Sequence, residues 1–546
     1  MSDIALVQPP LEDFYLTGKR TVPYGLLALA AALEKRGFSV TLVDALATAK
    51  NKIIPRPSAM DYLEPHFGRP DRSPFALFHH YRHFGYSFAH VAELVSRSGA
   101  FLVGISSLFT PYHEAALETA RIIKKRLPTC KIVVGGHHAT VLPEAVMACA
   151  AVDFVLRGEA ENSLPRLAAL VRQDRETAEE ALSAIPGLVW RRPTGVIEPA
   201  APAVVDDLDA QPPPAVHLLK SSFYRRHGRA GAVIVASRGC PLRCSYCAVS
   251  AAGGPPYRRR SLAGVMVEIE RAICGQGAGF IDFEDENLSL DRGWFMELLA
   301  ALARLRRDHV FELRAMNGLF PPSLDEPMIA AMAAAGFRTL NLAVGSFAPE
   351  QLARFRRPDV GRAHDRVLEL CRDQGLEAVS YLIAGAPGQT ALVTLSDLLH
   401  LLPQPTLAGL SIYYPAPGSL DYERAAAGGL LPSRYALLRS TALPLDQPQC
   451  RRLESVTLLR LSRIINFIKS LRNLGQPLPA PEPYSSPAAV LELSADDRPE
   501  GGRRLLSWFL ADGVIRGVTP AGEVYAHPTA IHLTRRLIEA IAKTGS

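Results

Sequence analysis

The chain has 546 residues, 48% of them hydrophobic and 21% charged, and a formal net charge of only +6. This length exceeds what one hydrophobic core organises and predicts three or four globular units. Because basic and acidic residues are interleaved, the composition gives no support to nucleic-acid binding. No secretory signal opens the sequence, and its longest apolar run, residues 26–33, is far shorter than the roughly 20 residues of a membrane span. We therefore expect a cytoplasmic protein with reduced thiols and no transmembrane segment.

Strand-like apolar runs alternate with helical stretches through residues 1–190. Residues 4–7 form an apolar run that ends before two prolines, and residues 24–37 are typical of a helix stopped by glycine. A second strand follows at residues 39–43, and the same alternation resumes from residue 101. The pattern predicts a Rossmann-like, doubly wound parallel sheet in an α/β protein, with ligand sites beyond the carboxyl ends of its strands.

The sequence at these predicted strand ends resembles the cobalamin-binding domain that precedes the barrel of many radical S-adenosylmethionine (SAM) enzymes. The resemblance rests on the early Pro-Pro, a helix opening P-x-G-L, a strand ending G-G-x-H-x-T, and R-G-E after the next strand. It implies cobalamin as a cofactor, with contacts from Pro10, Ser106, Ser107, Gly135, Gly136, His138, Gly158 and Glu159. The D-x-H-x-x-G motif that supplies an axial histidine in other cobalamin proteins is missing. The bland alternative is that these glycines and histidines form ordinary strand-to-helix turns.

Two segments interrupt or follow this pattern. Residues 48–95 are an insertion rich in proline, histidine and aromatic residues. Long loops of this kind are often functional, so the insertion either folds over the corrinoid or the substrate mouth, or decorates the surface. Residues 191–228 are rich in proline and alanine and are predicted to form a linker after a short hairpin.

The stretch SRGCPLRCSYCAVS, residues 237–250, carries Cys240, Cys244 and Cys247 in the spacing C-x3-C-x2-C. A disulfide framework needs an even number of cysteines in a short secreted chain. A structural zinc site needs a fourth ligand at a second paired spacing, and no such pair follows. A cubane iron–sulfur cluster normally takes four thiolates, so three leave one iron open. The loop therefore favours a 4Fe–4S cluster whose open iron can bind a substrate.

The spacing, the tyrosine before the third cysteine and the strand-like run ahead of the loop resemble the radical SAM enzymes. Later stretches add to the resemblance: FEDEN after a strand, G-x-P-G-x-T, and Y-x-P-x-P-G-S. The family implies that SAM chelates the open iron, with further SAM contacts from Tyr246, Glu284, Asp285, Asn317, Ser346, Gly385, Pro387 and Gly388. Gly345 stands where relatives usually carry glutamate, so one expected contact is absent.

Six strands, each but the last followed by a helix, occupy residues 229–430 and predict an open (β/α)6 partial TIM barrel, with chemistry at the strand carboxyl ends. Residues 431–546 are predicted to form a mainly helical region that caps the substrate. Its amphipathic helix, residues 451–475, either packs on the barrel or lies on a membrane surface, and packing is favoured. Cys274 and Cys371 are expected to be buried helix residues.

The resemblance implies that SAM is cleaved reductively to a 5′-deoxyadenosyl radical and that a methyl group passes from cobalamin to an unactivated carbon. The partners would be a small-molecule or lipid-like substrate and an electron donor such as flavodoxin or ferredoxin. No catalytic residue is identified. Two alternatives stay open, a radical cyclisation, rearrangement or oxidation without methyl transfer, and a non-catalytic corrinoid or metal sensor. Sulfur insertion is disfavoured because only two cysteines precede the loop.

Overall fold

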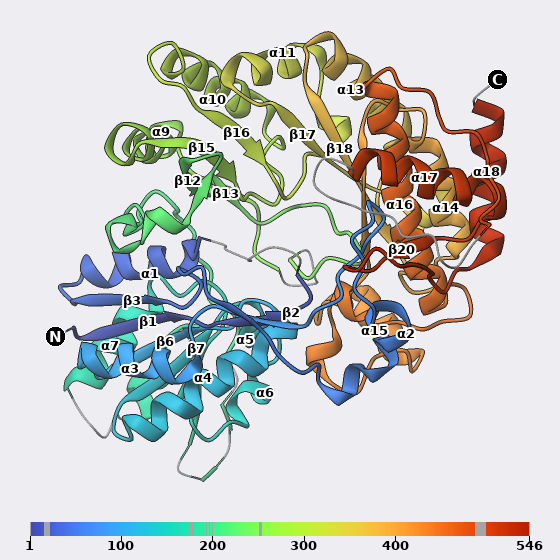
Figure 1. Ribbon diagram of the computed structural model, residues 1–546. Coiled ribbons are helices and arrows are strands. Elements are labelled where there is room, and N and C mark those ends of the chain that lie inside the picture. Colours follow the sequence, from blue (N-terminus) through green and yellow to red (C-terminus); the bar gives the residue numbers. More distant parts are fainter. Residues whose placement is uncertain are drawn as a thin grey trace.

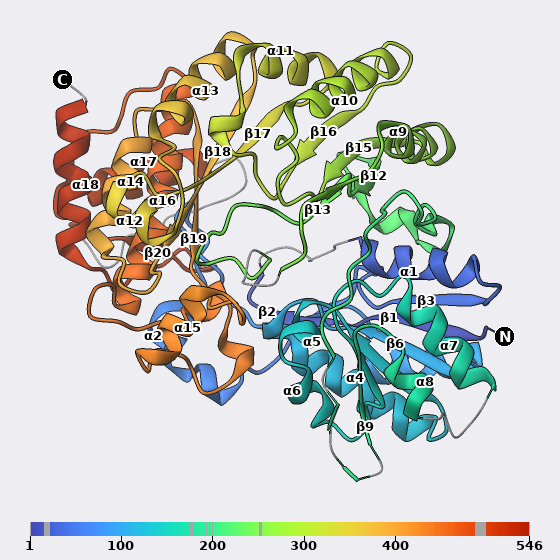
Figure 2. The same ribbon diagram turned by 180° about the vertical axis from the view of Figure 1, so that it is seen from behind.

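The computed structural model describes residues 2–15, 22–173, 179–192, 194–195, 197–198, 200–249, 254–485 and 498–544. Figures 1 and 2 show three parts: an N-terminal sheet flanked by helices, a second set of strands and helices above it, and C-terminal helices along one side. Among the described residues, no helix combines the length and apolar character that crossing a bilayer requires.

The N-terminal part is a seven-stranded sheet in the order β10-β9-β8-β7-β6-β1-β3. Its strands are β1 (Ile4–Gln8), β3 (Val40–Asp44), β6 (Leu102–Ser106), β7 (Lys131–Gly135), β8 (Phe154–Leu156), β9 (Leu188–Arg191) and β10 (Ile197–Glu198). Five neighbouring strands, β3, β1, β6, β7 and β8, pair in parallel. The β9–β10 hairpin adds two antiparallel strands beyond β8. The predicted doubly wound parallel sheet is confirmed, and its hairpin extends the sheet.

Helices cover both faces of this sheet. They are α1 (Tyr24–Glu34), α3 (Phe88–Ser98), α4 (His113–Arg126), α5 (His137–Val141), α6 (Pro143–Met147), α7 (Ser163–Gln173) and α8 (Glu179–Ser183). One buried cluster packs α3, α4 and α6 against one face, and a second packs α1 and α7 against the other. Since both faces are covered, the strands are apolar along nearly their whole length.

The insertion joins the two halves of the molecule. It contains β4 (Asn51–Ile53), α2 (Glu64–Phe67) and β5 (Arg82–Phe84), and β5 pairs with both β4 and β2 (Leu11–Asp13). Its aromatic residues share a hydrophobic cluster with residues of the barrel end and the C-terminal region. Figures 1 and 2 both show α2 beside α15. The insertion is therefore a packed element that covers the edge beyond the last barrel strand.

The central part has six parallel strands in two sheets. They are β12 (Arg229–Ile234), β15 (Ala278–Phe283), β16 (Glu312–Ala315), β17 (Thr339–Gly345), β18 (Glu377–Ala384) and β19 (Leu407–Ile412). Parallel bridges from Leu313 to Phe337 and from Leu319 to Leu342 connect the two sheets. The short β11 (Arg225–Arg226) pairs with β12, and β13 (Ser237–Arg238) pairs with β14 (Arg258–Arg259) on either side of the cysteine loop. This is the predicted open (β/α)6 barrel.

Five of the seven barrel helices, all but α12 and α13, begin at a residue whose side chain caps the helix. They are α9 (Leu262–Glu270), α10 (Arg292–Leu305), α11 (Glu326–Ala335), α12 (Pro349–Arg354), α13 (Gly361–Asp373), α14 (Ala391–Leu401) and α15 (Leu420–Ala427). Ser261, Asp291, Asp325, Thr390 and Ser419 each accept a hydrogen bond from the backbone three residues on. Such caps stabilise a helix start by about 1 kcal/mol and fix where each strand-to-helix loop ends.

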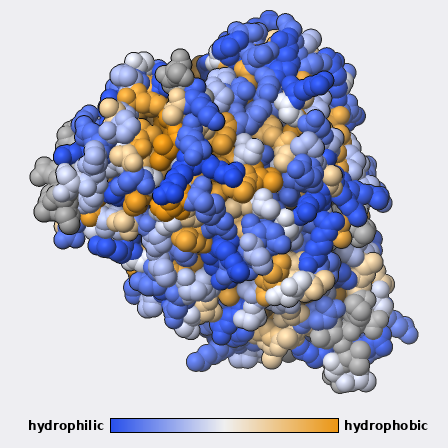
Figure 3. Space-filling view, turned by 90° about the vertical axis from the view of Figure 1, so that its right-hand side faces the viewer, coloured by the Kyte–Doolittle hydropathy of each residue, from blue (hydrophilic) through white to orange (hydrophobic). Residues whose placement is uncertain are grey.

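The C-terminal region contains α16 (Arg452–Asn473), α17 (Arg498–Asp512), α18 (Ile531–Thr544) and the hairpin β20 (Arg516–Val518) and β21 (Val524–Ala526). Leu458, Leu461, Ile465 and Ile468 of α16 are all fully buried. Arg460 of the same helix is also buried and pairs with Asp71 of the insertion. Figure 3, which faces this side of the molecule, shows several groups of hydrophobic side chains among hydrophilic ones. The apolar side of α16 is thus buried inside the protein.

Cys371 is buried as expected, but the expectation for Cys274 is wrong, because Cys274 is exposed. It lies in a π-helical turn, residues 271–275, that widens the end of α9, and its sulfur faces His309 at 3.6 Å. The widened turn shifts the residues after α9 off the apolar face of that helix, which explains the difference.

An ion pair joins the N-terminal sheet to the barrel. Arg258 of β14 donates two hydrogen bonds to Glu159, at 2.7 and 2.8 Å, and Arg238 donates to Glu161 at 2.6 Å. The Arg258 and Glu159 side chains are only 10% and 15% exposed. Burial by itself raises the pKa of Glu159, but the hydrogen bond from Arg258 holds this pKa below its usual value. This two-pronged pair fixes the strand ends of the sheet against the cysteine loop.

Replacing Arg258 by alanine leaves a buried carboxylate without its partner and is expected to cost about 3 kcal/mol of unfolding free energy. Arg258→Ala combined with Glu159→Gln removes that stranded charge, and we expect the double variant to recover part of the loss. Urea unfolding followed by circular dichroism measures both. Arg366→Ala, which breaks an exposed pair with Glu369, is the control and costs at most about 0.5 kcal/mol. Equal losses from Arg258→Ala and the control would contradict the assignment.

Candidate active site

The cysteine loop lies at the carboxyl end of β12 and is tied to the opposite side of the barrel. Ser245 donates through its hydroxyl to Asp421 at 2.7 Å and through its amide to the Phe355 carbonyl at 2.9 Å, while the Asp421 amide donates to the Ser245 carbonyl. Both side chains are buried. Asp421 begins α15, which follows the last barrel strand. The loop therefore closes the ring of strand ends from the first strand to the sixth.

The three cysteines of the loop are free thiols. Burial raises the pKa of Cys240, and the nearby thiols of Cys244 and Cys247 raise it further. Among the described residues, His364, Asp365 and His400 form a group whose potential metal-binding atoms all lie within 4.8 Å of one another, and this group is outside the cysteine loop. Three thiols are a ligand set that could hold an iron–sulfur cluster with one iron left without a protein ligand.

Arg357 lies against this loop and was not identified from the sequence. Its guanidinium donates to the Tyr246 hydroxyl at 3.0 Å, to the Cys244 sulfur at 3.7 Å and to the Ala343 carbonyl. The side chain is nearly buried, and its Nε has no hydrogen-bond partner. Tyr246 packs edge-on against Phe355 at 5.0 Å. Tyr246 thus lies beside the cysteines as predicted, held by a cation that no motif marked.

The acidic cluster after β15 includes a carboxyl group that is engaged within the protein. Asp285 is buried and accepts hydrogen bonds from the Ser237 hydroxyl and the Ala236 amide. Burial raises the pKa of Asp285 to about 7, against the lowering effect of these bonds. Asn317 donates to the carbonyls of Glu284 and Asp285. Asp285 and Asn317 therefore shape the backbone at the entry of the cysteine loop.

The other predicted SAM contacts lie on the loops after β17 and β18. Ser346 is fully buried, and its hydroxyl donates to Asp397 of α14 at 2.7 Å, so this side chain is committed to the helix layer. The turn of Gly385, Pro387 and Gly388 is held by the buried Gln447, which donates to the Gly385 and Ala386 carbonyls and accepts from the Gly388 amide. Gln447 was also missed, because it lies some 60 residues beyond the turn.

The predicted cobalamin contacts gather at the carboxyl ends of β1, β6, β7 and β8. The Ser107 hydroxyl and His138 Nε2 are buried without a hydrogen-bond partner. Gly136 has φ +117°, and a Cβ there would stand 2.6 Å from the Ser107 carbonyl oxygen. Only glycine fits at position 136 without strain or a clash. Two buried polar atoms without partners beside it fit a polar ligand that supplies the missing hydrogen bonds. Pro10 and Ser106 lie at the adjoining ends of β1 and β6.

Glu159 and Gly158 take part in the contact between the N-terminal sheet and the barrel. The Glu159 carboxylate is engaged by Arg258 and by the Val205 amide. Gly158 approaches Ala203 so closely that a Cβ would lie 2.2 Å from the Ala203 oxygen. The R-G-E motif therefore positions the linker and β14.

Strands β13 and β14 join the cysteine loop to the N-terminal sheet. Arg238 of β13 donates to Glu161, and Arg258 of β14 donates to Glu159, and both glutamates follow β8. The cysteine loop between these two strands therefore lies beside the carboxyl end of the sheet. Tyr15, which follows β2, shares a 2.8 Å hydrogen bond with Tyr112 beyond β6. Burial and, less strongly, Asp13 raise the pKa of Tyr15 to about 12.

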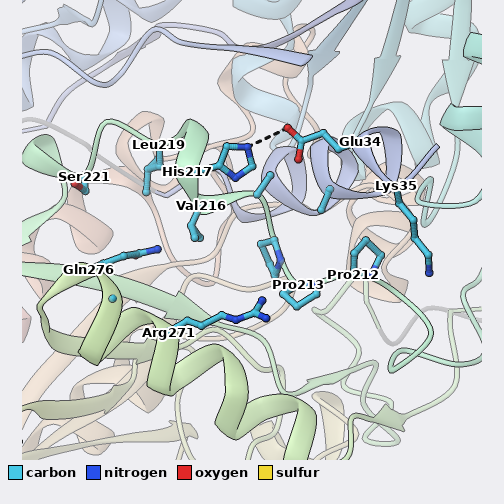
Figure 4. Close-up of a pocket in the computed structure, with 14 residues that line it drawn as sticks. Glu34, Lys35, Pro212, Pro213, Val216, His217, Leu219, Ser221, Arg271 and Gln276 are labelled. Atoms are coloured by element: carbon cyan, nitrogen blue, oxygen red, sulfur yellow. Dashed lines mark hydrogen bonds and ion pairs between the residues drawn. The ribbon is translucent and has the colours of Figure 1, made fainter. Parts of the chain in front are cut away.

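A separate surface cavity of about 710 Å³ lies between the end of α1, the linker and the π-helical turn. Figure 4 shows Lys35 and Arg271 on its two sides and the hydrogen bond between His217 and Glu34. None of the predicted site residues lines it. This cavity is distinct from the space between the cysteine loop and the sheet ends.

A three-thiol loop at the mouth of a (β/α)6 barrel, facing the strand ends of a Rossmann-like sheet, defines an iron–sulfur enzyme with a cofactor-binding domain. Residues 79–168 match the B12 binding domain family, and residues 234–398 match the radical SAM superfamily. The chain therefore carries a B12-binding domain followed by a radical SAM domain.

An uncharacterized methyltransferase of Pyrococcus horikoshii is 25% identical over 63% of this chain and 73% of its own length. The anaerobic magnesium-protoporphyrin IX monomethyl ester cyclase of Rubrivivax gelatinosus is 27% identical over 60% of this chain and 59% of its own length. The fold is shared with the radical SAM methyltransferase TsrM of Kitasatospora setae, solved with cobalamin and a 4Fe–4S cluster (TM-score 0.56, 22% identity, 78% of this chain and 75% of that one).

The buried His138 predicts a stability that falls in acid. Burial, reinforced by His113, lowers the pKa of His138 to about 3 in the folded protein, whereas an unfolded histidine has a pKa near 6.5. The unfolded state therefore binds more protons between these values, and stability falls by about 1.4 kcal/mol per pH unit as the pH drops below about 6.5. Urea unfolding of the apoprotein at several pH values measures this slope.

His138→Gln is expected to flatten that slope, because glutamine does not titrate. His217→Gln, which changes an exposed histidine paired with Glu34, serves as control and should leave the slope unchanged. An unaltered slope in His138→Gln would show that another group causes the acid sensitivity.

Proposed function

We propose that this protein is a cobalamin-dependent radical SAM methyltransferase that acts on an unactivated carbon. The observation that carries the proposal is the cysteine loop, which closes the barrel mouth through Ser245 and Asp421 and is joined at its base to the sheet of the B12-binding domain through Arg238–Glu161 and Arg258–Glu159. The methyltransferases among the relatives and the shared fold of TsrM support it.

Cys240, Cys244 and Cys247 would hold the 4Fe–4S cluster, and Tyr246, Glu284 and the turn at residues 385–388 would line the SAM side. When bound, these groups supply reductive cleavage of SAM and hydrogen removal from carbon, and cobalamin supplies the methyl group. The protein's own residues would position these groups and enclose them. Arg357 holds Tyr246 beside Cys244, and Gln447 holds the turn after β18, so the loops around the cysteines are preorganised.

Ser107, Gly136 and His138 would hold cobalamin between the ends of β6 and β7. The Ser107 hydroxyl and the His138 Nε2 atom are the unpaired polar atoms that such a ligand would satisfy. Burial keeps His138 neutral at physiological pH, so its Nε2 can donate or accept a hydrogen bond according to tautomer. We further assign residues 1–190 to the cofactor domain, 229–430 to the barrel and 431–546 to the substrate cap.

The same proposal includes a cytoplasmic location, a low-potential donor such as flavodoxin or ferredoxin, and a small-molecule or lipid-like substrate. Exposed apolar side chains at strand ends, Leu108 and Phe109 after β6 and Met316 after β16, support a substrate with apolar surface. Thiols that must ligate iron favour a reducing compartment.

A radical cyclisation is the second candidate, because a cyclase is among the relatives at 27% identity. The two reactions differ in their SAM products. Anaerobically reconstituted protein, incubated with reductant, SAM and candidate substrates, should form both 5′-deoxyadenosine and S-adenosylhomocysteine if it methylates. Formation of 5′-deoxyadenosine without S-adenosylhomocysteine would favour the cyclase.

Cys244→Ala is expected to lose the cluster and all SAM cleavage, because two thiolates are too few to hold it. Iron and sulfide analysis and 5′-deoxyadenosine production measure the loss, which should exceed 100-fold in product. Cys274→Ala removes an exposed thiol outside the loop and should keep about four irons and full SAM cleavage. Retained cleavage by Cys244→Ala would overturn the assignment of the cluster ligands, and no cleavage by iron-loaded wild type would favour a non-catalytic sensor.

A further inference from the structure

We propose that His364, Asp365 and His400 form a binding site for a divalent transition metal ion of the zinc type, outside the cofactor site. His364 and Asp365 lie near the start of α13, and His400 lies in the last turn of α14. One ligand atom from each residue lies within 4.8 Å of the other two. The site is in the helix layer that covers β18, away from the cysteine loop.

The distances within the trio already approach those of a metal site. Asp365 Oδ1 lies 3.0 Å from His364 Nδ1 and 3.1 Å from His400 Nε2. Ligands of a tetrahedral zinc ion, at about 2.05 Å from the metal, stand about 3.3 Å apart. Two sides of the triangle therefore have nearly the required length, and a small rotation of the His400 ring closes the third.

The buried histidine is oriented by a second hydrogen bond, as metal-bound histidines usually are. His364 is fully buried, and its Nε2 bonds to the Ser380 hydroxyl at 2.8 Å. Ser380 is in turn bonded to Thr406 at 2.9 Å. With Nε2 protonated toward Ser380, the Nδ1 lone pair points to Asp365 and His400.

The remaining coordination positions face solvent. The side chains of Asp365 and His400 are 38% and 36% exposed, so an ion can enter and keep water ligands. Phe347 packs on both rings, with centroid distances of 4.2 Å to His400 and 5.0 Å to His364. Two imidazoles and one carboxylate are the donor set that zinc and its neighbours prefer over magnesium or calcium.

Metal at this site would stabilise the loop after β17. Phe347, which contacts both histidines, donates its amide to Asp397, and the same carboxylate accepts the Ser346 hydroxyl. Asp397 lies one turn before His400 on α14. The ion would therefore link α13 to α14 and immobilise Phe347 between them. This role is structural and does not depend on the proposed methyl transfer.

The test uses anaerobically reconstituted protein, so that the three cysteines are occupied by iron. The protein is equilibrated with two equivalents of zinc chloride and desalted, and iron and zinc are measured by mass spectrometry. Wild type should retain one zinc per chain. His400→Gln and Asp365→Asn, which change partly exposed side chains, should bind zinc at least tenfold more weakly with unchanged iron. His532→Gln, a histidine paired with Glu454 elsewhere, should retain the zinc.

Thermal unfolding gives an independent readout. Zinc should raise the unfolding temperature of wild type and of His532→Gln but not of His400→Gln, because a ligand that binds only the folded state stabilises it. Equal zinc content in wild type and in both site variants would overturn the proposal, as would no retained zinc in any of them. In either case the trio is a hydrogen-bonded His–Asp–His contact, and the proposed radical chemistry is unaffected.

Discussion

The hydrogen bonds between Ser245 and Asp421 are the constraint on which the candidate site depends. An open barrel has two free edges, and the cysteine loop after the first strand is held at its base by the β13–β14 pair but has no strand neighbour at its tip. The backbone and side-chain bonds of Ser245 to α15 and to the Phe355 carbonyl supply that neighbour. With the loop fixed, Tyr246 reaches Arg357 and Cys247 faces Tyr414. The insertion and the C-terminal helices then pack against the remaining edge, beyond β19.

The fold was predictable because its signals are local. Apolar runs and glycine stops, such as the one at Gly37, mark many of its strands and helices. The cysteine spacing predicted the cluster loop for the same reason, since its three thiols lie within eight residues. The glycine-rich turn at residues 385–388 also carries its signal in a few adjacent positions.

What the sequence did not reveal is long-range. Gln447 and Asp421 act on segments 60 and 176 residues away, and a single glutamine or aspartate has no pattern that announces such a partner. Glu159 was expected at cobalamin because it follows a strand end, yet Arg258, 99 residues later, engages it. The prediction that Cys274 is buried failed for a different reason. A π-helical turn changes the helical period on which that prediction relied.

The glycine at position 345, where relatives usually carry glutamate, follows from the backbone of the β17 loop. Gly345 has φ +85°, and a Cβ there would stand 3.8 Å from Arg357 and Phe355. Space is therefore available, but the left-handed conformation is strained for any residue with a side chain. That conformation lets the next residue, Ser346, turn into the helix layer and reach Asp397. The lost carboxylate and the anchored serine are thus one structural choice, which leaves Arg357 as the charged side chain that borders this part of the cysteine loop.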